Sequence, residues 1–253
     1  MKKLSILLIV FLMTFSLGCT SQTQNNSENQ ISAPPQQGQQ PPNSSATPPS
    51  NSTGNQIDIN ATYKLSSGSV TLSNKTFEAN SNDTSAIYVS DSGYLKLNNV
   101  KVTTTGNASS QDKSSFYGLN AAVLASNGGT IEMDDGSINT TGTGANGAFS
   151  YGQGSAVTLS GVTINTKADG AHAVMATGGG TMDLSNVKMT TAGTSSGAIA
   201  TDRGGGTINA LNVTIETSRM NSPAIYSTGN IAVKNSQLNS TGSESAVIEG
   251  ANT

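Results

Sequence analysis

The sequence predicts an all-β fold, a right-handed parallel β-helix solenoid with three strands per rung and about seven rungs, where one rung is one coil of the chain. Two observations carry this prediction: an alanine followed by an aliphatic or aromatic residue recurs along the chain, and short alternating apolar runs follow it. The marker pairs are Ala86-Ile87, Ala122-Val123, Ala148-Phe149, Ala173-Val174, Ala198-Ile199, Ala224-Ile225 and Ala246-Val247. Neighbouring marker alanines are 36, 26, 25, 25, 26 and 22 residues apart, a solenoid period that is too short for propeller blades.

The N-terminus has the features of an export signal. Lys2 and Lys3 precede an apolar run that is too short to span a bilayer, so we expect residues 1–18 to be a signal peptide. The following "SLGC" resembles the lipobox of bacterial lipoproteins, although Ser16 departs from its commonest form. The resemblance implies a lipid on Cys19, the single cysteine, and attachment to the extracellular face of the cell membrane.

A linker is expected next. Residues 19–56 contain the lipidated Cys19 and a stretch of Gln, Asn, Ser, Thr and Pro that has too little apolar surface to fold. We therefore expect a disordered tether between the membrane and the domain, which is assigned to residues 57–253. Solenoids normally end in a cap, and Thr253 leaves the last rung unfinished, so we expect this domain to be C-terminally incomplete.

Within the repeat, the corner between the second and third strands has a restricted composition. The equivalent residues are Asn99, Asp135, Gly161, Asn186, Asn212 and Asn235. Because Asn, Asp and Gly tolerate the left-handed backbone conformation, we expect each corner to adopt it, and stacked asparagines to bond one another.

The repeat leaves two apolar features open. The first strand of each rung is apolar on both faces, which indicates either a contact surface or a stripe covered by another segment of the chain. The long first interval contains an insertion, residues 103–120, in which Phe116 and Tyr117 are the candidate binding residues for a sugar or a partner. Packing of the two rings as a plug over the rung is the alternative.

Composition excludes several functions. The net charge of −3 with no basic patch argues against nucleic acid as a partner. One Cys and one His rule out an intramolecular disulfide, a cysteine-based zinc site and a histidine cluster. No cofactor is expected.

The candidate catalytic residues are His172, Asp202 and Arg203. His172 is the only histidine, and the marker alignment places glycine beside it in both neighbouring rungs. Asp202 lies five positions further along the equivalent strand, about 16 Å away at 3.3 Å per residue. Because a general base must reach its partner, we favour a structural or surface role for His172 over catalysis.

One acidic cluster is a candidate calcium site. Glu132, Asp134 and Asp135 lie at one corner, where carboxylates favour Ca²⁺. The favoured interpretation is a solvated corner in which Lys96 pairs with Glu132 across two rungs.

The repeat over residues 62–253 resembles the pectate-lyase-like right-handed parallel β-helix superfamily, and more closely the adhesin-like secreted β-helix lipoproteins of bacteria and methanogenic archaea. That resemblance implies the fold more than an activity, because some members of the superfamily cleave polysaccharides while many others only bind or display. We expect a non-enzymatic cell-surface lipoprotein that binds an extracellular polysaccharide or surface protein. The alternative is a polysaccharide lyase or glycoside hydrolase using Asp202, Arg203 and His172, with calcium as its metal.

Overall fold

The computed structural model describes residues 57–249. The expected signal peptide, Cys19 and the tether lie outside the described residues, as do residues 250–253. No helix in the described part is long and apolar enough to cross a bilayer.

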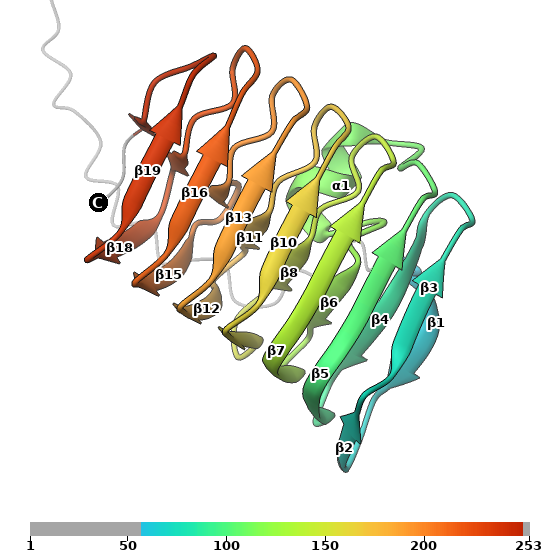
Figure 1. Ribbon diagram of the computed structural model, residues 1–253. Helices are drawn as coiled ribbons and strands as arrows, with labels where there is room; N and C mark the ends of the chain where they lie inside the picture. Colours follow the sequence, from blue (N-terminus) through green and yellow to red (C-terminus); the bar gives the residue numbers. More distant parts are fainter. Residues whose placement is uncertain (1–56, 250–253) are drawn as a thin grey trace, which may run out of the picture. The chain divides into compact units, whose positions relative to one another are not determined.

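The chain forms a parallel β-solenoid in which each rung adds one strand to the first sheet (Figure 1). To the second sheet each complete rung adds two short strands or, at β5 and β7, one long unbroken strand. The first sheet contains, in spatial order, β1 (Asn60–Leu65), β4 (Thr84–Ser90), β6 (Val123–Ser126), β8 (Ala148–Tyr151), β11 (Val174–Thr177), β14 (Ile199–Thr201), β17 (Ile225–Ser227) and β20 (Ala246–Ile248). Every pairing in it is parallel.

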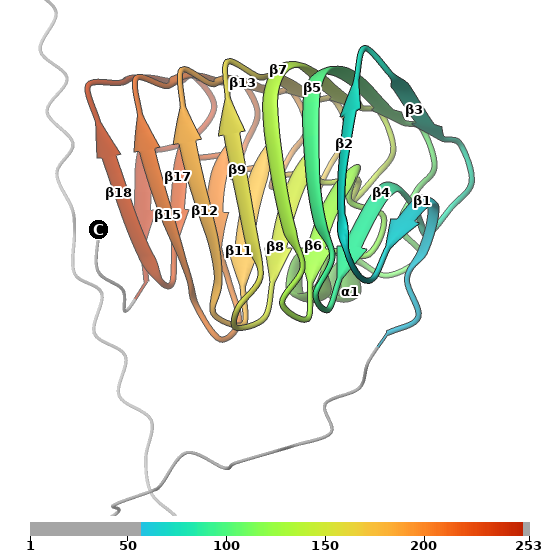
Figure 2. The same ribbon diagram turned by 90° about the horizontal axis from the view of Figure 1, so that it is seen from below.

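The second sheet holds the other two strands of each rung (Figure 2). Its members are β2 (Ser69–Ser73), β3 (Thr76–Ala79), β5 (Tyr94–Thr104), β7 (Thr130–Thr140), β9 (Ala156–Ser160), β10 (Thr163–Thr166), β12 (Gly180–Ser185), β13 (Lys188–Thr191), β15 (Gly206–Leu211), β16 (Thr214–Thr217), β18 (Asn230–Lys234) and β19 (Gln237–Ser240). β5 and β7 run unbroken through the corner, so the predicted second and third strands belong to one sheet.

The solenoid has one rung more than the alanine markers indicate. The first sheet has eight strands, so β20 begins an eighth rung after seven complete ones. The additional rung starts at β1, where Thr62 stands in register with Ala86 because its neighbours Ala61 and Tyr63 pair with Ser85 and Ile87. A threonine in the marker column hid this rung in the sequence.

The predicted left-handed corners are confirmed. The φ angles are 50° at Asn99, 58° at Asp135, 68° at Gly161, 54° at Asn186, 55° at Asn212 and 53° at Asn235. Asn74, at 55°, adds the first rung to this column. The predicted side-chain bonds are also present: Asn99 Nδ2 donates to Asn74 Oδ1 at 2.8 Å, and Asn212 Nδ2 donates to Asn186 Oδ1 at 3.4 Å.

The marker alignment is wrong by one residue at two places. Val123 pairs with Ala148, so Gly147 and not Ala148 stands in the alanine column. Likewise Ile225 pairs with Ala246. A one-residue shift moves a side chain to the other face of a strand. Phe149 therefore points outward, although the alignment had placed it in one column with Val123 and Val174, which point inward.

The interior of the solenoid is closely packed. The inward side chains of the first sheet are fully buried from Ile87 to Ile199 and pack against aliphatic residues of the second sheet such as Leu97 and Met133. Burial of this apolar column is the main force holding the rungs together.

The outer face of the first sheet is covered by the insertion. Residues 103–120 contain a helix, α1 (Gln111–Tyr117), with Ser110 as N-cap and Gly118 as a left-handed C-cap. Figure 1 shows α1 on the side of the first sheet that faces away from the second. The covered residues include Leu124, Phe149, Met175 and Ala200, which pack with Leu119, Ala121 and Ile59. The apolar stripe is thus covered by the same chain over these rungs, and the contact-surface interpretation is wrong there.

Candidate functional site

A groove of about 480 Å³ lies between α1 and the corners that lead into the later strands of the first sheet. We call it the insertion groove. It is lined by Gln111, Ser115, Asp169, Gly170, His172, Thr194, Ser195, Gly197, Asp202, Asn221, Pro223 and Tyr226. Two of the three candidate catalytic residues, His172 and Asp202, are therefore in one hollow.

The helix that forms one wall of this groove is tied to the solenoid by hydrogen bonds. Ser114 Oγ donates to the carbonyl of Gly144, and Asn146 Nδ2 donates to the carbonyl of Ser114 at 3.2 Å. Thr177 Oγ1 donates to the Phe116 carbonyl at 2.7 Å. Because these contacts involve buried groups on separate rungs, the wall is held in a fixed position.

Several lining residues are positioned by a second corner, for which the repeat gave no signal in the sequence. It precedes the first strand of each rung and has left-handed residues at Gly144, Gly170, Ser195 and Asn221, with φ of 65°, 65°, 53° and 55°. These positions hold Gly, Ser and Asn, so no single residue type recurs from rung to rung that a sequence alignment could detect.

His172 lines the groove and is held there by one ring nitrogen. Its Nδ1 lies 3.0 Å from the carbonyl oxygen of Gly197, and a carbonyl only accepts, so Nδ1 carries the proton and Nε2 is a bare acceptor. Burial lowers the pKa of His172 from 6.5 to about 4, and the hydrogen bond to Gly197 opposes the shift. The imidazole is therefore neutral at pH 7.

The predicted neighbours of His172 need one correction. Gly197 lies beside it in the next rung, but the preceding rung contributes Asn146, whose Oδ1 accepts from the His172 backbone N–H at 2.8 Å. This follows from the register shift at Ala148. The histidine backbone is thus anchored by a buried asparagine.

Asp202 lies at the far end of the groove, after β14. Its Oδ1 accepts from the backbone N–H of Arg203 at 2.7 Å. Burial raises the pKa of the Asp202 carboxyl; the Arg203 bond and charge oppose the shift, and the charges of Glu249 and Asp112 add to it. Within residues 57–249, no hydrogen bond or ion pair joins Asp202 to His172.

Arg203 does not line the groove and instead packs on the insertion. Its guanidinium carbon lies 4.1 Å from the centroid of the Phe116 ring. Tyr117 meets Tyr151 edge to face, with ring centroids 5.3 Å apart. Phe116 and Tyr117 are half-buried, so the two candidate binding rings occupy the position of the expected plug.

Tyr226 is a lining residue that the sequence analysis treated only as part of the apolar stripe. Its hydroxyl donates to Glu249 Oε2 at 3.0 Å. Burial first, and then this bond, raise the pKa of Tyr226 to about 12, so the phenol keeps its proton at neutral pH. Nothing in the repeat indicated that its strand bordered a hollow.

The acidic corner contains an ammonium group. Lys96 Nζ lies 3.4 Å from Glu132 Oε2 and 3.1 Å from Asp134 Oδ2, so the expected Lys96–Glu132 pair is present. Asp135 occupies the left-handed corner with φ of 58°. In the part of the chain that the structure describes, no three His, Cys, Asp or Glu residues are grouped so that they could hold a metal ion.

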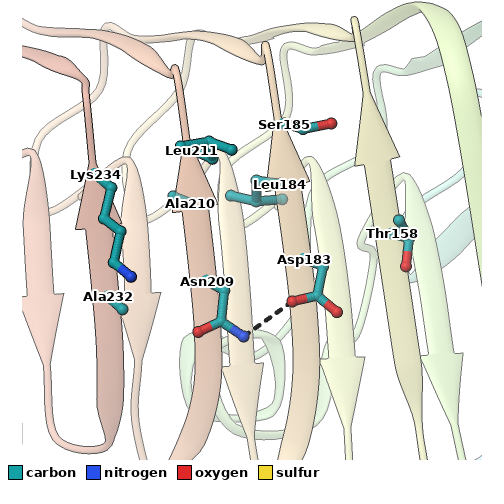
Figure 3. Close-up of a pocket in the computed structure, with 9 residues that line it drawn as sticks. All are labelled: Thr158, Asp183, Leu184, Ser185, Asn209, Ala210, Leu211, Ala232 and Lys234. Carbon is teal, nitrogen blue, oxygen red and sulfur yellow. Dashed lines mark hydrogen bonds between the residues drawn. The ribbon is translucent and has the colours of Figure 1, made fainter.

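A second hollow of about 370 Å³, which we call the sheet groove, lies on the outer face of β9, β12, β15 and β18. Figure 3 shows Asp183 and Asn209 side by side on adjacent strands, where Asn209 Nδ2 donates to Asp183 Oδ1 at 2.9 Å. Lys234 and Leu211 belong to the neighbouring outward column. The hollow is a shallow depression between these two columns.

The fold and these two grooves define a parallel β-solenoid with two solvent-facing hollows that are lined by both polar and apolar groups. A scan of protein-family models finds no family that matches the chain. No curated protein matches it, and neither does any solved structure.

Proposed function

We propose that this protein is a non-enzymatic, lipid-anchored solenoid displayed outside the cell, and that it binds a polysaccharide or a surface partner. The proposal rests on the insertion groove, a hollow of about 480 Å³ that is lined by several polar side chains. Hydrogen bonds between α1 and the solenoid hold its walls in place. Ligand sites are concave and usually preformed, with a few polar groups that fix orientation.

The same geometry favours binding over turnover. A histidine with a pKa of about 4 is a poor general base at neutral pH, since the ideal catalytic pKa lies near the working pH. Arg203, the third candidate catalytic residue, stacks on Phe116 outside the groove.

One observation favours the enzyme as a second candidate. Asp169 and Asp202 line the same groove, and glycoside hydrolases act through two carboxyl groups, one of them with a raised pKa. This is the polysaccharide hydrolase or lyase expected as the alternative.

The two functions are separated by incubating the full-length chain, purified in detergent, with immobilised uronate, neutral and amino polysaccharides. Binding predicts retention on at least one of them without new reducing ends or unsaturated products. If wild type releases such products and the Asp202→Asn variant does not, the protein is an enzyme and the proposal of a non-enzymatic function is wrong. A protein that is retained neither on any of the polysaccharides nor on whole cells, and that releases no products, would overturn both functions.

Matched variants locate the binding face. Asp202→Asn changes the insertion groove, Asp183→Asn makes the same chemical change in the sheet groove, and Glu216→Gln alters an exposed carboxylate on β16 that lines neither. We expect only Asp202→Asn to weaken retention. Weakening by Asp183→Asn alone would move the proposed site to the sheet groove.

The anchor is tested separately. Cys19→Ala is expected to abolish incorporation of labelled fatty acid and to release the protein from the membrane fraction. Unchanged fatty-acid labelling of the variant would contradict lipidation at Cys19.

A further inference from the structure

On the basis of the proposed function, we infer that the insertion groove recognises an amino sugar with a free, protonated amine within a polysaccharide, and not a uronate. Four lining side chains, those of His172, Gln111, Asp169 and Asp202, keep an acceptor atom with no partner within residues 57–249, and the charged side chains that line the groove are both carboxylates. Both properties select a ligand that supplies N–H and O–H donors and a positive charge.

These four acceptors follow from the hydrogen bonds that the same side chains already make. His172 donates from Nδ1 to Gly197, which leaves Nε2 to accept. The Gln111 amide nitrogen donates to Ser115 Oγ at 3.2 Å and to the Gly170 carbonyl at 3.1 Å, so its oxygen faces no partner within residues 57–249.

Each of the two lining carboxylates has one oxygen that accepts a backbone hydrogen bond and one that does not. Asp169 Oδ1 accepts from the Thr194 backbone N–H at 2.7 Å, and Asp202 Oδ1 accepts from that of Arg203 at 2.7 Å. Each keeps a second oxygen with no partner in the described part of the chain. Hydrogen bonds to an ionised group are about twice as strong as neutral ones, so these oxygens are the strongest remaining acceptors.

The charge around the groove discriminates between sugars. None of its lining residues is Lys or Arg, and Asp112 and Glu249 add negative potential at Asp202. The charge of Arg203 acts on Asp202 with the opposite sign, but its guanidinium is held over the Phe116 ring and does not line the groove. A uronate carboxylate entering this groove would be repelled, whereas an ammonium group would be attracted.

The shape of the groove favours a sugar ring over a lysine side chain as the source of the ammonium. The acceptors belong to several rungs, and neighbouring rungs are about 4.8 Å apart. A ligand that bonds to all of them must therefore carry several donors at spaced positions, as a sugar ring does. Tyr226 lines the groove with its hydroxyl bonded to Glu249, leaving the half-buried ring for contact with the apolar face of a sugar or with its ammonium group.

The test compares oligosaccharides that differ in the amine alone. Calorimetry at pH 6 and low salt measures binding of the full-length protein to glucosamine oligomers, to fully N-acetylated oligomers of the same length, to galacturonate oligomers and to lysine oligomers. We expect the glucosamine oligomers to bind at least tenfold more tightly than the acetylated ones, and the galacturonate oligomers not to bind.

Variants tie the preference to the groove. Asp202→Asn and Asp169→Asn keep the oxygen that accepts a backbone N–H but remove the charge, and each is expected to weaken glucosamine binding at least fivefold. Glu216→Gln is the matched control and is expected to leave it unchanged. Unchanged unfolding midpoints of the two groove variants show that they fold.

The outcomes separate this inference from the proposed function. Equal binding of acetylated and free-amine oligomers, or binding that survives both Asp variants, overturns the inference and leaves a polysaccharide-binding solenoid. Lysine oligomers that bind as tightly as glucosamine oligomers overturn the amino sugar in favour of a protein partner. Failure of every saccharide and lysine oligomer to bind overturns the inference, and retention on whole cells then decides the proposed function.

Discussion

The guanidinium carbon of Arg203 lies 4.1 Å from the centroid of the Phe116 ring, which joins the loop after β14 to the end of α1. The two residues are separated by 87 positions (203 − 116) in the sequence. The two side chains contact each other, and neither of them lines the groove.

Removing the guanidinium is expected to loosen the insertion. A cation over an aromatic ring contributes about 0.5–1 kcal/mol at exposed sites, so Arg203→Ala should lower the free energy of unfolding by about that amount. Amide hydrogen exchange in residues 111–117 should speed up. Arg203→Lys, which keeps the charge, is the control and should lose less. Equal exchange in wild type and Arg203→Ala would show that the contact does not hold the helix.

The corrected register makes a prediction about Gly147. A Cβ added there would lie 2.4 Å from the Ala173 carbonyl oxygen and 2.7 Å from Ile164 Cγ2. Overpacking of this kind costs about 1–3 kcal/mol, so Gly147→Ala should lower the urea midpoint of unfolding. Thr163→Ala, on the outward face of β10, should have little effect. Full tolerance of Gly147→Ala would support the original alignment, which places alanine in this column.

The sequence predicted the fold where a repeated residue type had a single physical cause. The corner from Asn99 to Asn235 was found because only Asn, Asp and Gly readily adopt φ near 55°. The alanine column was correct at Ala86, Ala122, Ala173, Ala198 and Ala224. It failed at Ala148 because Gly147 and Ala148 are both small, and a sequence alignment accepts either one in the column. The hydrogen-bonded register of the strands shows that the position belongs to Gly147.

The site was only partly accessible from the sequence. His172 and Asp202 attracted attention as rare residue types in a chain of Gly, Ser, Thr and Asn. Gln111 and Ser115 could not be found, because the insertion falls outside the repeat and folds back onto rungs far along the chain. One wall of the groove is formed where the insertion contacts these later rungs, and a contact of this kind leaves no repeating pattern in the sequence.

The corner asparagines are expected to be replaceable by glycine but not by alanine. Asn186 is exposed with φ of 54°, a conformation that costs an ordinary L-residue about 1–2 kcal/mol. Asn186→Ala should therefore lower the free energy of unfolding by about 1 kcal/mol, as measured by urea unfolding, since asparagine itself tolerates this conformation. Asn186→Gly removes the same amide without the strain. If the two variants were equally destabilised, the side-chain bond and not the backbone angle would be the cause.

His172 should make stability depend on pH. Its folded pKa of about 4 lies below the ordinary 6.5, so the unfolded chain binds the proton more tightly. The stabilisation is fully present above pH 6.5 and is lost as pH falls through 4, by at most about 3 kcal/mol at 1.36 kcal/mol per pKa unit.

The measurement compares urea unfolding of wild type and His172→Gln at pH 7 and pH 4. The difference between the two proteins isolates the histidine from Asp202, whose raised pKa acts in the opposite direction. Because the chain has a single histidine, its NMR titration is unambiguous. A midpoint near 6.5 in the folded protein would contradict the burial of the ring.

The hydrogen bonds from α1 to the solenoid also bear on how the molecule unfolds. In a solenoid each repeat contacts only its neighbours, so rungs can be lost one at a time. Here a helix that follows β5 is bonded near Gly144, Gly170 and Thr177 and packs on Arg203, which places one short segment across the fourth, fifth and sixth rungs. Those rungs should melt as one cooperative block. β18 and β19, to which the described residues bond no such helix, should exchange their amides earlier.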